Sequence, residues 1–112
     1  MRVLILDELN SDEVSQCREY LKKFAIPGSL EDLYWYILPE KMLTPTQKEL
    51  NENEGPYKIC IEIGKDFIKF ELLVRADMIH NKGAGSVDKK QMLHLYRLID
   101  EMAKELKLVT CR

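Results

Sequence analysis

The stretch from Tyr57 to Arg75 constrains the fold more than any other part of the chain, because apolar and polar residues alternate along it on both sides of a short turn. Alternation with a period of two is the pattern of a strand that buries one face. The turn lies at Gly64-Lys65-Asp66, between the two alternating runs. The stretch therefore predicts an antiparallel hairpin in a sheet with one covered face.

Two registers keep the apolar side chains of this hairpin on one face, since they differ by two residues. A two-residue loop that starts at Gly64 pairs Ile61 with Ile68, whereas a loop one residue later pairs Ile61 with Phe70. Glycine suits the first position of a type II′ turn. The sequence therefore favours the first register.

Three segments carry the signal of a helix start, which is a capping residue followed three positions later by Glu or Gln. The pairs are Asn10 with Glu13, Thr44 with Gln47, and Asp88 with Gln91. The first helix is expected to end before Pro27-Gly28, and the second, with proline at its first position, is expected to be short. The third continues into a long apolar stripe from Met92 to Leu106 and should lie across the sheet.

Two further segments are expected to form strands. Arg2 to Leu6 contains a short apolar run, which is typical of a buried strand, and the start of a helix is the alternative because the run is short. Leu30 to Leu38 is compatible with a helix capped by Ser29 or with a strand, and its aromatic residues are ones that strands favour. We expect one helical turn there, followed by a strand from about Leu33.

The order of these elements, β-α-β-(short α)-β-β-α, predicts an α+β fold. We expect a single small domain, residues 1–112, with an antiparallel or mixed sheet of about four strands and helices mainly on one face. The composition agrees, since 46% of the residues are hydrophobic and 32% are charged, as in ordinary globular domains.

The charge balance and the apolar runs bear on the partners of the chain. The 17 basic and 19 acidic residues are interspersed, whereas nucleic-acid binders usually show a basic excess or stripe. No stretch approaches the ~20 apolar residues that cross a membrane. We therefore expect a cytoplasmic protein that binds neither nucleic acid nor membrane.

The residue types used for catalysis and metal binding do not form a known pattern. Three cysteines, Cys17, Cys60 and Cys111, include no CxxC pair, and the histidines His80 and His94 have no zinc-ligand spacing. Reduced thiols are the simplest interpretation. The sequence thus favours a non-enzymatic protein without a metal or cofactor.

Aromatic residues are the strongest candidates for a binding surface, because Tyr and Trp are enriched at protein interfaces. The interface candidates are Tyr34, Trp35, Tyr36, Tyr57 and Phe67. If the segment around Trp35 is a strand, its aromatic residues point to both faces of the sheet. The sequence therefore predicts a protein-interaction or regulatory module that binds a protein partner or a second copy of itself as a homodimer.

A glycine-rich loop before the last helix is the basis of an alternative. Backbone N–H groups of such loops and of helix N-termini bind anions. The candidate residues are Asn81, Lys82, Gly83, Gly85 and Ser86. The alternative function is accordingly a protein or enzyme that binds a small anion such as phosphate or a carboxylate.

Overall fold

The computed structural model describes residues 3–77 and 83–108, in which five antiparallel strands form one sheet in the order β1-β5-β4-β3-β2. The strands are β1 (Val3–Leu6), β2 (Ile26–Pro27), β3 (Leu33–Ile37), β4 (Lys58–Ile63) and β5 (Ile68–Glu71). A two-stranded sheet pairs β6 (Leu73–Val74) with β7 (Gly85–Ser86).

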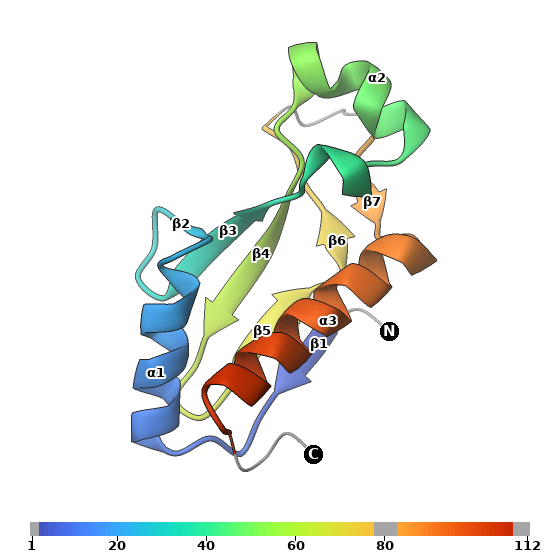
Figure 1. Cartoon of the computed structure of the whole chain (residues 1–112). Coiled ribbons are helices and arrows are strands. Elements are labelled where there is room, and N and C mark those ends of the chain that lie inside the picture. Colours follow the sequence, from blue (N-terminus) through green and yellow to red (C-terminus); the bar gives the residue numbers. More distant parts are fainter. Residues whose placement is uncertain (1–2, 78–82, 109–112) are drawn as a thin grey trace.

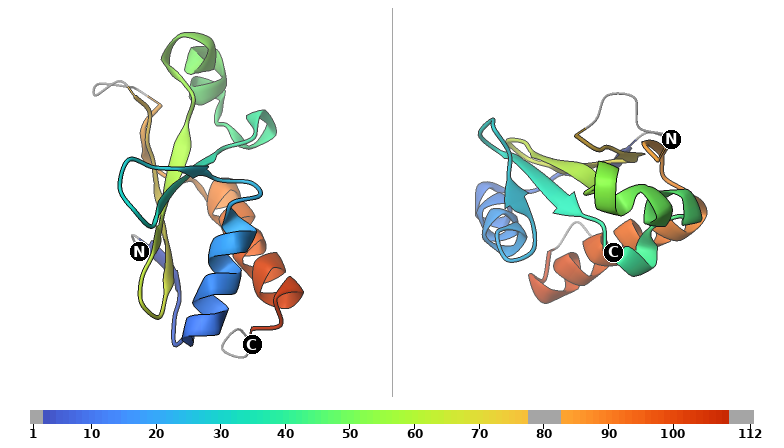
Figure 2. Two further views of the ribbon diagram at one scale, coloured as in Figure 1. Left: turned by 90° about the vertical axis from the view of Figure 1, so that its left-hand side faces the viewer. Right: turned by 90° about the horizontal axis from the view of Figure 1, so that it is seen from above.

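Two helices, α1 (Ser11–Leu21) and α3 (Lys89–Glu105), cover the same face of the five-stranded sheet (Figure 1). The two views of Figure 2 show that both helices lie on one side of the strands. Helix α2 (Pro45–Glu54) and the 3-10 helix η1 (Glu40–Met42) lie beyond one end of the sheet. The predicted α+β class is confirmed. None of the helices in the described ranges is long and apolar enough to cross a membrane.

The three predicted helix starts are confirmed as capping boxes. In each, the cap side chain accepts a hydrogen bond from the backbone N–H three residues later: Glu13 N–H donates to Asn10 Oδ1 (2.8 Å), Gln47 N–H to Thr44 Oγ1 (3.2 Å), and Gln91 N–H to Asp88 Oδ1 (2.8 Å). These bonds satisfy donors that have no partner inside the helix. The helix starts therefore follow from local sequence alone.

The favoured register of the hairpin is wrong, and the alternative one is present. Ile61 pairs with Phe70, and Ile63 pairs with Ile68. The N–H of Gly64 donates to the carbonyl oxygen of Phe67 (2.8 Å), which leaves only positions 65 and 66 in the turn. A Cβ at position 64 would collide with the Phe67 ring. Glycine at this position thus allows the close approach of the Phe67 ring.

The sheet is antiparallel and has five strands, in agreement with the prediction of an antiparallel or mixed sheet of about four. Strand β2 forms the edge of the sheet next to β3, and β6 and β7 form a separate two-stranded sheet. Each of these three strands has two residues, too few to show a periodic pattern in the sequence. The segment from Leu33 is a strand, as expected, and pairs with β4 along its whole length.

The hydrophobic core lies between the sheet and its two helices. Strands β4 and β5 bury every second side chain on this side, namely Ile59, Ile61, Ile63, Ile68 and Phe70. The helices contribute Val14, Cys17 and Leu21 from α1 and Leu95, Met102 and Ala103 from α3. We call this side of the sheet the covered face and the opposite side the uncovered face.

A buried pair of glutamines joins the core to the end of the molecule that carries α2. Gln91 is fully buried, and its Nε2 donates to the carbonyl oxygen of Met42 (3.0 Å) and to Oε1 of Gln47 (2.8 Å). Nε2 of Gln47 donates in turn to the carbonyl oxygen of Gly83 (2.8 Å). Buried amides need such partners. This network therefore fixes α2 and Gly83 against α3.

Candidate functional site

The five predicted interface residues are divided between the core and the uncovered face. Tyr34, Tyr36 and Tyr57 are buried, with at most 7% of each residue exposed, so they belong to the core. Trp35 and Phe67 are only partly buried. Because neighbouring residues of a strand point to opposite faces, Trp35 lies on the uncovered face. The candidate surface therefore contains Trp35 and its neighbours.

The half of the uncovered face formed by β2 and β3 is apolar. Leu33, Trp35 and Ile37 alternate with the buried tyrosines of β3, and all three are partly exposed. Ile26 of β2 pairs with Trp35 and is 54% exposed. We name this set of four residues the apolar half. β3 is thus apolar on both faces, unlike a strand with one solvated face.

The half formed by β4 and β5 is charged. Lys58, Glu62, Lys69 and Glu71 point to the uncovered face, between the buried residues of their strands. Glu62 forms an ion pair with Lys69 of the neighbouring strand (3.1 Å), and Glu71 forms one with Arg75 (2.7 Å). Both signs are therefore present, and the ion pairs are partly solvated.

Trp35 lies at the boundary between the two halves. The Nζ atom of Lys58 lies 4.6 Å from the centroid of the Trp35 ring, a cation–π contact. The same ammonium forms an ion pair with Asp77 (2.7 Å). These contacts hold the long side chain of Lys58 along the indole ring. The aromatic surface is therefore preorganised at this boundary.

The two thiols in the described ranges are poor nucleophiles. Burial, assisted by the carboxylate of Glu71, raises the pKa of Cys60 above its ordinary value. Burial and the nearby carboxylate of Glu13 raise the pKa of Cys17 to about 11. Since the thiolate is the reactive form, the raised pKa values of both thiols disfavour it near neutral pH. Among the described residues, no group of three His, Cys, Asp or Glu side chains could hold a metal ion.

The glycine loop is described only in part, because Asn81 and Lys82 lie outside the described residues. Gly83 lies so close to Tyr57 that an added Cβ would be 2.6 Å from its hydroxyl oxygen. Gly85 and Ser86 form β7. The described part of the loop therefore has a packing role, and binding of a small anion by residues 81–86 stays a prediction.

His94 makes a contact that the sequence did not indicate. Its Nε2 atom and the Tyr36 hydroxyl form a hydrogen bond of 2.7 Å, and the two rings stack with centroids 5.9 Å apart. Burial, together with the charge of Lys41, lowers the pKa of His94. The two residues are 58 positions apart in the chain. Helical spacing placed His94 outside the apolar stripe, and no local signal revealed its partner on β3.

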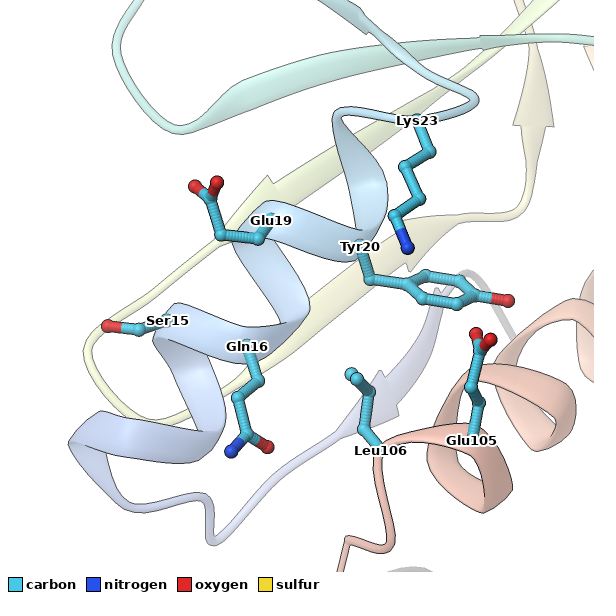
Figure 3. A pocket seen from close by; sticks show the side chains of 7 residues that line it. All are labelled: Ser15, Gln16, Glu19, Tyr20, Lys23, Glu105 and Leu106. Carbon is cyan, nitrogen blue, oxygen red and sulfur yellow. The ribbon is translucent and has the colours of Figure 1, made fainter.

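A cleft of about 440 Å³ opens between α1 and the end of α3 (Figure 3). Tyr20 points from α1 toward α3, with Lys23 and Glu105 on either side of its ring. The Lys23 Nζ atom lies 5.8 Å from the ring centroid, and burial and the carboxylate of Glu105 raise the pKa of the Tyr20 hydroxyl. Glu19 at the rim forms an ion pair with Lys22 (2.9 Å). The charged groups of the cleft thus interact with Tyr20 or with Lys22 beside the cleft, and its described lining forms no recognisable catalytic arrangement.

The uncovered face therefore offers the clearest binding geometry on the described part of the chain, with an aromatic residue among aliphatic ones and charges beside them. Comparison of the chain with models of protein families, with curated proteins and with solved structures finds no match.

Proposed function

We propose that this domain is a non-enzymatic protein-interaction module that binds its partner through the apolar half of the uncovered face. The observation that carries the proposal is the position of Trp35, which lies partly exposed among Leu33, Ile37 and Ile26. Trp is the residue type most enriched among those that dominate binding energy at interfaces.

The surroundings of Trp35 support this function. Protein interfaces have an apolar centre and a polar rim, and charged residues are depleted at the centre. The apolar half provides such a centre, and the ion pairs of β4 and β5 lie beside it. Because these charges have both signs, they favour a partner with a mixed polar rim.

The proposal is tested by crosslinking in cells, followed by purification of the tagged protein and quantitative mass spectrometry. We expect a reproducible protein partner crosslinked to Lys58 or Lys69, the lysines of this face. Trp35→Ala and Ile26→Glu should each weaken binding by about thirtyfold and reduce recovery of the partner accordingly, which corresponds to the ~2 kcal/mol contribution of a central interface residue.

Leu30→Glu is the matched control, because Leu30 is 66% exposed in the loop before β3 and lies outside the sheet. It should retain the partner. Thermal unfolding of each purified variant shows that the fold is kept. Crosslinks confined to other surfaces, or equal recovery with all three variants, would contradict the proposal.

A further inference from the structure

The two edges of the five-stranded sheet differ in how well they are protected. Edge strands expose unpaired backbone groups, and natural proteins blunt them with short strands, proline or charge. Strand β2 has two residues and one of them is Pro27. Strand β1 reads Val-Leu-Ile-Leu, without charge or proline, and within the described ranges it pairs on one side only, with β5. The β1 edge is therefore open to a further strand.

Three large apolar residues that are exposed lie in strand β1 or in helix α3, the elements near this edge. Ile5 of β1 is 50% exposed, and Leu93 and Tyr96 of α3 are 49% and 58% exposed. In Figure 1, helix α3 crosses in front of β5 and β1, whereas α1 lies to the left of them. His94 contacts Tyr36 of β3, and a position two residues later on a helix is rotated by about 200°. Tyr96 therefore faces away from β3, toward the β1 edge.

Leu93 and Tyr96 belong to a stripe along α3 that is complementary to itself. The stripe consists of Lys89, Leu93, Tyr96 and Asp100, at the spacing i, i+4, i+7 and i+11 that places residues on one helix face. Its basic end and its acidic end are equally far from its apolar centre. A second α3 packed antiparallel therefore places Leu93 beside Tyr96 of the other copy and Lys89 beside its Asp100. Within its own helix, Asp100 also forms an ion pair with Lys104 (2.9 Å).

Strand β1 is self-complementary in the same sense. Antiparallel pairing about Ile5 places Ile5 opposite Ile5 of the second copy and Leu4 opposite its Leu6. Directly opposed residues share a face of the sheet, so this register keeps the apolar residues of both copies on matching faces. A two-fold axis perpendicular to the sheet relates both strands and both helices, as an isologous dimer requires.

We propose that the protein forms a homodimer in which the β1 strands of two copies pair and the α3 stripes pack against each other. The dimer covers Leu93 and Tyr96 on the side of α3, brings Ile5 beside its copy on the uncovered face, where Ile5 lies opposite Lys69, and joins two sheets into one. The apolar half around Trp35 lies toward the other edge of the sheet and remains free. This inference therefore does not depend on the function proposed above, and either can fail alone.

Sedimentation velocity of the full chain over a wide range of concentration tests the dimer. We expect a concentration-dependent monomer–dimer equilibrium. Tyr96→Glu and Ile5→Lys should each raise the dissociation constant by about tenfold or more. Tyr96→Glu places a carboxylate beside Leu93 of the other copy, and Ile5→Lys places two lysines opposite each other. Ile26→Lys, at the opposite edge, is the matched control and should leave the dissociation constant unchanged.

A charge exchange tests the two-fold packing of α3. Lys89→Asp should weaken the dimer, because it brings a new carboxylate beside Asp100 of the other copy, and addition of Asp100→Lys should restore it. Circular dichroism shows whether each variant is folded. A wild-type monomer at all concentrations overturns the proposal, as does a dimer that resists both Tyr96→Glu and Ile5→Lys. Because Asp100→Lys also breaks the ion pair with Lys104 in the same helix (2.9 Å), the Asp100→Lys single variant is the reference for the exchanged pair. An exchanged pair that binds no more tightly than either single variant overturns the packing of the helices.

Discussion

The two faces of the sheet are built from the same strands but differ in the residue types that they carry. On β4 and β5, isoleucine and phenylalanine point to the covered face, while lysine and glutamate point to the uncovered face. This is the usual alternation of a sheet with one solvated side. On β3, tyrosines point to the covered face but Trp35 and its aliphatic neighbours point to the uncovered face. The departure of one strand from the rule marks where a partner is expected.

The largest expected effect contrasts adjacent residues of β4. Ile59 is fully buried on the covered face, and Cys60 points to the uncovered face. Ile59→Ala should lower the free energy of unfolding by about 2–5 kcal/mol, because it removes packed methyl groups and leaves a cavity. Cys60→Ala should cost less than about 1 kcal/mol. Chemical denaturation measures both, and similar losses for the two variants would contradict the difference between the faces.

A smaller effect is expected where the covered side holds a polar group. Gln91→Leu should lower the free energy of unfolding by about 1–3 kcal/mol, because Gln47 and the carbonyl of Met42 lose their buried donor. Gln16→Leu, on the exposed side of α1, is the matched control and should be nearly neutral. A stable Gln91→Leu variant would show that packing alone, without the hydrogen bonds, holds α3 against α2.

The smallest expected effect is the pH dependence from His94, which is only partly buried. Its pKa is lowered in the folded state, so the fold favours the neutral imidazole. The unfolded chain then binds more protons between the folded pKa and about 6.5, and stability rises with pH through that window. The stability is reduced in acid below it.

Unfolding of the wild type and of His94→Gln, measured from acidic to neutral pH, isolates this contribution. Glutamine does not titrate, so the difference in stability between the two proteins should change across the window. The groups that face the imidazole, Tyr36, Lys41, Arg97 and Glu101, are the same in both. A difference that stays constant with pH would show that His94 acts by packing alone.

The local features of this protein could be predicted from neighbouring residues of the chain. The three helix starts, the hairpin and the strand at Leu33 depend on residues within a few positions of one another, and all are present. The signals are the capping residues of the helices and the alternation of apolar and polar side chains in the strands. Both involve residues only a few positions apart.

Contacts between distant segments decide which side chains pack against a neighbour. These contacts could not be predicted from the sequence. The ring of Phe67 over Gly64 accompanies the hairpin register that forms, and the packing of α3 on β3 brought His94 to Tyr36. The tertiary packing of the whole chain buried three of the predicted interface aromatics and left Trp35 partly exposed. Composition shows that such residues will be buried or bound, but the choice depends on which layer covers which face, and that is set only when the whole chain is folded.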